Sequence, residues 1–294
     1  IRWDGHASFA RCTWQCGIAL REATGYVSLQ GSWQPNALEA KGQVQLQEVW
    51  VGRLPLREVV SEMQIREGMV YFPGVRAKLL DGQVFGPIRY DYHPRREFRL
   101  DLTVNQVNLQ ALGQQLLGQP TKARGKVYAR LILSGQPGDW PTLRGKGTLS
   151  VTDGHIYDLP PFLNLLNLLS GQLPRQAAFQ EVQARLDIAG RRVIFRRVEL
   201  LGEALTLRGQ GSMRIDGTEL DLEMYALLWG RSLPLLPPGI DRIPPLISRQ
   251  LAKIHMRGSL QEVTVTREPV PLVTDALRLL WQLGPGRLED SYEP

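Results

Sequence analysis

Apolar and polar residues alternate with a period of two along much of this chain, and this pattern limits what the chain can fold into. The clearest runs are residues 98–104 (FRLDLTV), 127–133 (VYARLIL), 186–188 (LDI) and 220–224 (LDLEM). Because successive side chains of a β-strand point to opposite faces, the alternation predicts strands with one apolar and one polar face. The sequence therefore predicts an antiparallel sheet that is solvated on one side.

Short glycine-containing pairs separate the apolar runs. Glycine adopts positive φ without steric cost, so such pairs favour the tight turns of β-hairpins. The chain contains 29 glycines and 20 prolines in 294 residues, which favours many turns over a few long helices. We expect roughly 14 to 17 short strands at the spacing typical of all-β proteins. The predicted turns are Glu67-Gly68, Asp81-Gly82, Asp153-Gly154, Ala189-Gly190 and Asp216-Gly217.

Two internal similarities indicate a repeating architecture. Residues 143–151 (LRGKGTLSV) resemble residues 207–215 (LRGQGSMRI), and residues 40–44 (AKGQV) resemble residues 123–127 (ARGKV). Stacked hairpin repeats build an extended sheet rather than a closed globule. The predicted fold is mainly β, a long antiparallel meander of hairpins on the order of 70 Å long. The paired glycines, Gly145 with Gly147 and Gly209 with Gly211, predict either a bend of the strand or a simple bulge.

The sequence predicts few helices. Asn108 is a candidate N-cap of a short helix that carries Leu109, Leu112 and Leu116 and ends at Gly118. Further helices are predicted at residues 160–169, which are apolar nearly all round, and at 240–254 and 272–283. Four short helices are too few to cover one face of so many strands.

No catalytic template fits the chain. It contains neither G-x-S-x-G nor H-E-x-x-H, and its glycine pairs lead into strands, whereas a phosphate-binding loop needs a helix N-terminus behind it. The carboxylates Asp221 and Glu223 alternate with apolar residues and are therefore expected to face solvent. The histidines, which are scattered without partners at ligand spacing, are His6, His93, His155 and His255. We predict a protein that is not an enzyme and needs no cofactor or metal.

The two cysteines give little information. Cys12 and Cys16 are about 13 Å apart if they share a strand, too far for a disulfide, whereas in a loop or helical turn they can pair. His6 nearby gives only a weak indication of a metal site, and buried or free thiols are the plainer interpretation.

The chain is basic, with 35 Lys and Arg against 29 Asp and Glu and a formal net charge of +6. The densest arginine clusters lie at residues 95–99 and 191–197. Nucleic-acid binding calls for a dense basic stripe interleaved with aromatic residues, which these clusters do not form. They predict a solvated face or contacts to lipid headgroups, and no nucleic-acid partner.

Residues 123–170 combine these features in a characteristic order. A basic-Gly strand is followed by LSG (133–135), LRGKGTLSV (143–151), DGHI (153–156), Leu-Pro and an apolar helix at 162–169. This order resembles the C-terminal region of AsmA-like proteins, the superfamily that includes TamB-, YhdP- and YdbH-type proteins. Residues 205–222 and 256–265 (MRGSLQEVTV) fit the same pattern, so the resemblance covers roughly residues 60–270. We therefore divide the chain into strands of the same sheet at 1–60, an AsmA-like repeating β-groove at 61–270, and a C-terminal helix with an acidic tail at 271–294.

The resemblance implies a long, twisted sheet curled into an apolar trough. Proteins of this family are conduits for phospholipid between the inner and outer membranes of diderm bacteria. By resemblance, the parent protein is periplasmic and anchored in the inner membrane by a helix that is absent from this chain, which begins at Ile1 and contains no apolar run of about 18 residues. Membrane proteins at either end are conceivable partners. The family supplies no catalytic residues.

The residues themselves also favour lipid binding. An apolar sheet face must be buried against something, and with little helical cover it must close on itself or hold an apolar ligand such as phospholipid acyl chains. Plain core packing is the alternative for every inward-facing residue. The residues predicted to line the groove are Leu100, Leu102, Val104, Leu131, Leu133, Leu149, Val151, Leu186, Ile188, Leu205, Leu207, Met213, Ile215, Leu220, Leu222 and Met224.

The leading hypothesis is thus a non-enzymatic lipid-binding module of an intermembrane phospholipid transport protein. The alternative is an assembly or scaffold protein of outer-membrane biogenesis that binds a client β-strand at its sheet edge. A continuous apolar lumen favours lipid, whereas an exposed, flat edge strand favours a client. A carbohydrate-acting β-solenoid would need carboxylates or aromatics that point from one face. In this chain those residues mostly share the solvent side, which disfavours that function.

Overall fold

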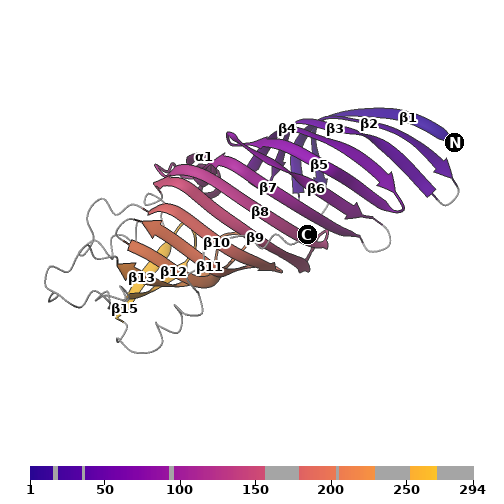
Figure 1. The fold of residues 1–294 in the computed structure, drawn as a ribbon. Helices are drawn as coiled ribbons and strands as arrows, with labels where there is room; N and C mark the ends of the chain where they lie inside the picture. The colour runs from indigo at the N-terminus through magenta and orange to yellow at the C-terminus, as the bar shows by residue number, and fades with distance from the viewer. Residues whose placement is uncertain are drawn as a thin grey trace, which may run out of the picture.

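A computed structural model of the chain describes residues 1–15, 19–34, 37–92, 96–155, 179–202, 205–228 and 252–269. All fifteen strands of these ranges belong to a single antiparallel sheet, in which each strand pairs with its neighbours in sequence. The sheet curls without closing into a barrel, so β1 and β15 are its two edges (Figure 1). The predicted meander is confirmed, and the strand number agrees with the alternation.

The strands are long compared with those of ordinary globular proteins. Their bounds are β1 (Arg2–Gln15), β2 (Ala19–Gln34), β3 (Ala37–Val51), β4 (Leu54–Arg66), β5 (Met69–Leu79), β6 (Gly82–Asp91), β7 (Glu97–Asn108), β8 (Arg124–Gln136), β9 (Asp139–His155), β10 (Phe179–Ala189), β11 (Arg192–Gly202), β12 (Leu205–Arg214), β13 (Leu220–Leu228), β14 (Ala252–Gly258) and β15 (Val263–Pro269).

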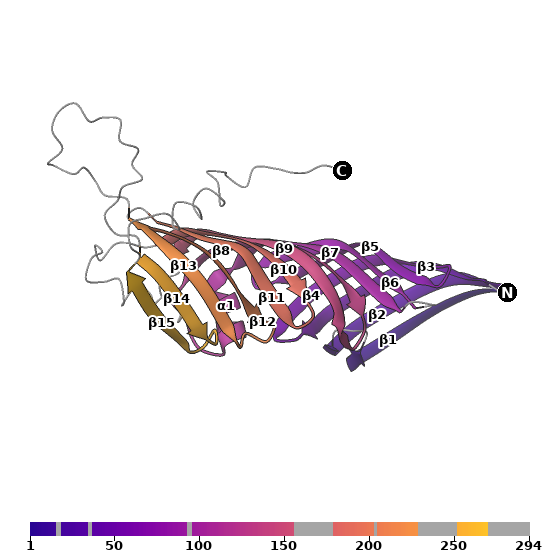
Figure 2. The same ribbon diagram turned by 90° about the horizontal axis from the view of Figure 1, so that it is seen from below.

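The helix α1 (Leu109–Leu117) lies between β7 and β8, where the sequence predicts it. The Asn108 side chain accepts hydrogen bonds from the amides of Gln110 and Ala111, and Gly118 closes the helix in the left-handed conformation. Leu109 is buried in the main apolar cluster, and Leu112 packs against it. We call the sheet face that carries α1 the inner face, and the sheet curls around it (Figure 2).

Because the sheet is a meander, its connections fall on two rims. The helix rim carries α1 and the other connections that follow odd-numbered strands. The turn rim carries those that follow even-numbered strands. Three hydrogen bonds join successive hairpins along the turn rim: from Gly190 N to Leu143 O (2.8 Å), from Ile215 N to Arg191 O (2.9 Å) and from Leu260 N to Gly217 O (2.9 Å). The turn rim is therefore a continuous edge from β8 to β15.

Bulges interrupt the strand pairing in a recurrent way. Arg11, Glu22, Glu58 and Gln106 have φ between 50° and 56°, and each lies at a shift of register between its strand and a neighbour. In each case an extra residue lets the strand bend while the apolar side chains stay on the inner face. In β7, for example, the inward positions run through Val104 and resume at Val107.

Two local predictions are wrong. Asp153-Gly154 forms no turn but continues β9, because these two residues face the single residue Gly125 of β8, between the pairs Lys126–Thr152 and Arg124–His155. An Asp-Gly pair serves here as part of a bulge. The predicted helix at 240–254 does not reach its end, because Ile254 lies in β14. The rest of that helix, and those at 160–169 and 272–283, fall outside the described residues.

Candidate functional site: the inner face of the sheet

A row of cross-strand neighbours runs along the middle of the inner face from one edge of the sheet to the other, and we call it the central row. Directly paired residues of antiparallel strands share a face, and twelve of the fourteen steps of the row are such pairs. The other two steps, Ser61 to Val75 and Gly86 to Leu102, join the positions next to the pairs Val60–Arg76 and Phe85–Thr103. Ser61 is its one polar member. The central row consists of Ala7, Val27, Val44, Ser61, Val75, Gly86, Leu102, Leu131, Gly147, Leu186, Phe195, Gly211, Leu222, Met256 and Val265.

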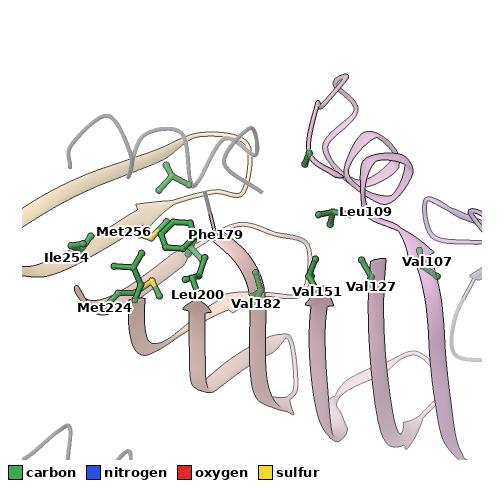
Figure 3. Close-up of a cluster of buried hydrophobic side chains, with 14 of the residues drawn as sticks. Val107, Leu109, Val127, Val151, Phe179, Val182, Leu200, Met224, Ile254 and Met256 are labelled. Carbon is green, nitrogen blue, oxygen red and sulfur yellow. The ribbon is translucent and has the colours of Figure 1, made fainter. Parts of the chain in front are cut away.

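A second row, nearer the helix rim, is buried in the main apolar cluster, and we call it the upper row. Figure 3 shows several of its members side by side beneath α1. Phe179 packs beside it and is almost completely buried. The upper row consists of Val107, Val127, Val151, Val182, Leu200, Leu207 and Ala226.

The structure separates the predicted groove residues by exposure. Those fully buried in the apolar clusters are Leu100, Leu133, Val151, Ile188, Leu207, Leu220 and Met224. Those half-buried on the inner face are Leu102, Val104, Leu131, Leu149, Leu186, Met213 and Leu222. Ile215 lies in the turn after β12 and is 41% exposed, and the side chain of Leu205 is outside the described part. The half-buried set is the part of the prediction that a ligand on the inner face can reach.

Several inner-face residues were missed by the sequence analysis. Phe195 and Leu200 belong to one strand, but the arginine pair 196–197 shifts the register between them and breaks the alternation. Within this strand the apolar inward positions are odd-numbered up to Phe195 (Val193, Phe195) and even-numbered after it (Val198, Leu200). This switch is the sequence signal that would have identified the bulge. In β2–β5 the inward positions are smaller residues among many polar ones, so their alternation is weaker.

The glycine pairs make room for large neighbouring side chains. A Cβ on Gly147 would lie 3.2 Å from Leu186 Cδ1, and one on Gly211 would lie 2.8 Å from Leu222 Cδ2. Around Gly147 the register with β8 and β10 is unbroken, which excludes a bulge there. At Gly211 the register shift involves the facing strand β11. These glycines therefore leave space on the inner face for the side chains of Leu186 and Leu222, and they let the strands approach closely.

The outer face carries the charges. Lys253 Nζ lies 3.0 Å from Glu223 Oε2, and Arg196 Nε lies 2.7 Å from Asp187 Oδ2. Glu199 is the most buried of these carboxylates and pairs with two arginines, Arg197 and Arg208, at 2.7 Å each. Burial opposes ionisation of Glu223, yet hydrogen bonds from Tyr225 and Lys253 hold its pKa below the ordinary range. Arg197 and Glu199 pair within β11, and the other pairs join neighbouring strands.

Asp101 and Arg130 form the best-aligned ion pair of this face. Arg130 donates two hydrogen bonds, 3.0 Å from Nε to Oδ1 and 2.9 Å from Nη2 to Oδ2. These bonds, against a smaller opposing effect of burial, lower the pKa of the Asp101 carboxyl. A depressed folded-state pKa contributes stability above the unfolded-state pKa, and this contribution disappears as pH falls through the folded-state value.

We expect Asp101→Asn to destabilise the protein by about 0.5–1 kcal/mol at pH 7, because both partners are near the surface. The difference from wild type should shrink as pH falls below about 4, where the wild-type carboxylate begins to protonate. Urea unfolding at pH 7 and pH 3 checks this, with Arg130→Gln and the double variant completing a thermodynamic cycle. A difference that stays constant with pH would contradict an electrostatic origin.

Other chemistry is sparse in the described ranges. They contain no group of three His, Cys, Asp or Glu residues that could hold a metal ion, and Cys12 is a free thiol. Cys16 is outside them. A hollow of about 480 Å³ lies where Pro73 and Gly74 open the pairing of β4 with β5, and Val44, Glu62 and Arg76 are among its lining residues. Its lining mixes apolar, polar and charged side chains.

Comparisons of the chain with protein families, with curated protein sequences and with solved structures find no match. Within the described ranges, no helical segment has the length and hydropathy that crossing a bilayer requires.

Proposed function

We propose that this chain is a non-enzymatic lipid-binding module that holds phospholipid acyl chains along the inner face of its sheet. The observation that carries the proposal is the continuity of the central row, which is apolar on fourteen of fifteen strands. A continuous apolar strip is what separates a lipid conduit from an ordinary core, which needs no continuity from edge to edge.

The strip has the properties that a sliding ligand needs. Most of its residues are half-buried, with Gly147 and Met256 buried and Ala7 exposed. Each buried methylene of a lipid would contribute about 0.8 kcal/mol without a preferred direction. A chain bound in this way can move along the row, because each step exchanges one apolar contact for another of similar strength.

Headgroups would remain at the rims, where the chain offers cations. On the turn rim the guanidinium of Arg191 stacks 5.4 Å from the ring centroid of Trp140, which is itself 42% exposed. Arginine binds phosphate well, and tryptophan favours the boundary between apolar and aqueous regions. The resemblance noted above extends this proposal to phospholipid transfer between the inner and outer membranes, with the chain in the periplasm.

The alternative, a scaffold that binds a client β-strand, is favoured by one observation. β1 is a fourteen-residue edge strand, and its edge facing away from β2 has no paired strand in the described part of the chain. At the other end of the sheet, β15 has seven residues and ends at Pro269. Long edges without proline or lysine readily accept another strand. One experiment distinguishes the two functions.

That experiment is native mass spectrometry with lipid extraction on the purified chain. We expect phospholipid to co-purify with wild type and to fall at least fivefold in the double variant Val75→Asp/Leu131→Asp, which places two carboxylates on the inner face. The matched control is Val60→Asp/Phe85→Asp, because these apolar side chains are 42% and 40% exposed. All variants are compared by circular dichroism.

Wild-type protein that carries no phospholipid and takes up none from mixed vesicles would overturn the proposal. That result would favour the client-strand function, for which we expect an added peptide strand to protect the amides of β1 from hydrogen exchange.

A further inference from the structure

The central row consists of two segments with different side-chain sizes. From β1 to β6 its members are Ala7, Val27, Val44, Ser61, Val75 and Gly86, so that none is larger than valine. We call this the wide segment. From β7 to β14 the row is built of leucine, phenylalanine and methionine, interrupted by Gly147 and Gly211. We call this the narrow segment.

The two glycines do not widen the narrow segment, because their neighbours occupy the space. Leu186 and Leu131 reach over Gly147, with Cδ1 atoms 3.2 and 3.5 Å from where its Cβ would be, and Leu222 reaches over Gly211. In the wide segment, the nearest atoms around Gly86 are backbone atoms of Asp101 and Leu102. The side chains of the central row are therefore larger from β7 onward, and the trough is shallower there than over β1–β6.

Helix α1 also fills part of the interior. The carbonyl of Leu116 accepts a 2.7 Å hydrogen bond from Arg53, which precedes β4 on the helix rim. The carbonyl of Leu117 accepts one of 3.2 Å from Gln261, which joins β14 to β15 on the turn rim. Because the C-terminal end of α1 is hydrogen-bonded to both rims, the helix lies across the opening of the curled sheet. Leu109 and Leu112 of the helix fill the interior beneath it.

The wide segment is accessible and has the smaller side chains. Val27, Val44, Ser61 and Val75 are half-buried and Ala7 is exposed, although Leu46, Val59 and Met63 beside the row are buried and form walls. Five buried residues of this part, Ala23, Leu46, Val49, Val59 and Ala77, form a small cluster of their own, whereas Leu79 and Val84 belong to the main cluster. Five strand spacings of about 4.8 Å give this floor a length of about 24 Å. One leaflet of a bilayer has about 15 Å of hydrocarbon, so the floor accommodates the tails of one phospholipid.

We propose that the acyl chains of a bound phospholipid rest on the wide segment, floored by Val27, Val44 and Val75, and that α1 with the narrow segment is a constriction that bounds this resting site. This rests on the proposed function and makes it more specific. Lipid rests over β1–β6, and the half-buried part of the central row from β7 to β14 is the narrower continuation of the strip.

Site-specific photo-crosslinking on the full chain tests this assignment. A diazirine amino acid is introduced singly at Val44, at Val75, at Leu222 in the narrow segment and at Val60 as the exposed control. After incubation with vesicles of phosphatidylglycerol and phosphatidylethanolamine, adducts are counted by mass spectrometry. We expect at least tenfold more phospholipid adduct at Val44 and Val75 than at Leu222 or Val60.

A second measurement does not depend on the photo-reactive residue. Val44→Trp fills the floor and should lower co-purified phospholipid at least fivefold, whereas Val60→Trp should leave it unchanged. Adducts at Leu222 equal to or above those at Val44 would overturn the wide-segment site while leaving lipid binding intact. Absence of phospholipid from wild type as well as from every photo-crosslinked position would instead reject the proposed function itself.

Discussion

Replacing Leu207 with aspartate is expected to lower the free energy of unfolding by more than about 5 kcal/mol and to abolish cooperative unfolding of the sheet from β10 to β14. Leu207 is 0% exposed and pairs with Leu200 on one side and Ala226 on the other. Loss of a buried leucine costs about 2–5 kcal/mol, and burial of an unpaired carboxylate adds several more. Such a sum approaches the whole stability of a typical domain.

Urea unfolding followed by circular dichroism measures this effect, and two variants control for it. Leu207→Met conserves volume and should cost less than about 1.5 kcal/mol. Gln210→Asp places the same carboxylate on the same strand at an exposed position and should be nearly neutral. A Leu207→Asp protein that unfolds at the wild-type urea concentration would show that the upper row is open rather than packed. If the upper row is packed, Leu207 is a poor position at which to test lipid binding.

The sequence predicts the architecture well because it depends on local, repeated signals. Alternation around Leu100, Leu131 and Leu222 gives the strands and their inner face, and the residues Asn108 and Gly118 give both ends of α1. The meander follows from the short turns between strands.

The sequence does not predict how the sheet curls around α1. The contacts of α1 with Arg53 and Gln261 join residues 63 and 144 positions from their partners, and no periodicity encodes such pairs. Whether an inward leucine is sealed or reachable depends on these contacts. Leu207 and Leu222 therefore look alike in the sequence, although one is fully buried and the other half-buried.

Bulges are a second feature of the fold that the search for alternation with a period of two does not predict. Asp153-Gly154 predicts a turn by composition, yet the pairing of β8 with β9 continues past it. Conversely, Gln106 carries no turn signal but adopts positive φ inside β7. An extra residue between apolar positions, as from Val104 to Val107, is the usable indicator, and it marks the points where the sheet acquires its curl.

Gly209→Ala is the second change for which we expect a large effect, a loss of about 2–4 kcal/mol that exceeds the benefit alanine usually brings to a strand. A Cβ on Gly209 would lie 2.1 Å from the carbonyl oxygen of Glu223 and 2.8 Å from Met224 Cα, both of them backbone atoms of β13. The strand pair must separate to accept the methyl group, and β13 is held on its other side by β14. The physical cause is steric, because no positive φ is involved at this position.

Gly74→Ala is the matched control, because a Cβ there meets nothing within 4 Å and its φ is also not positive. It should change the urea midpoint little or raise it slightly, through reduced freedom of the unfolded chain. If Gly209→Ala and Gly74→Ala shift the midpoint equally, the close approach of β12 and β13 is not what these glycines provide. A selective loss at Gly209 would mean that the repeated Gly-x-Gly motif brings neighbouring strands close together, and so maintains the shape of the trough.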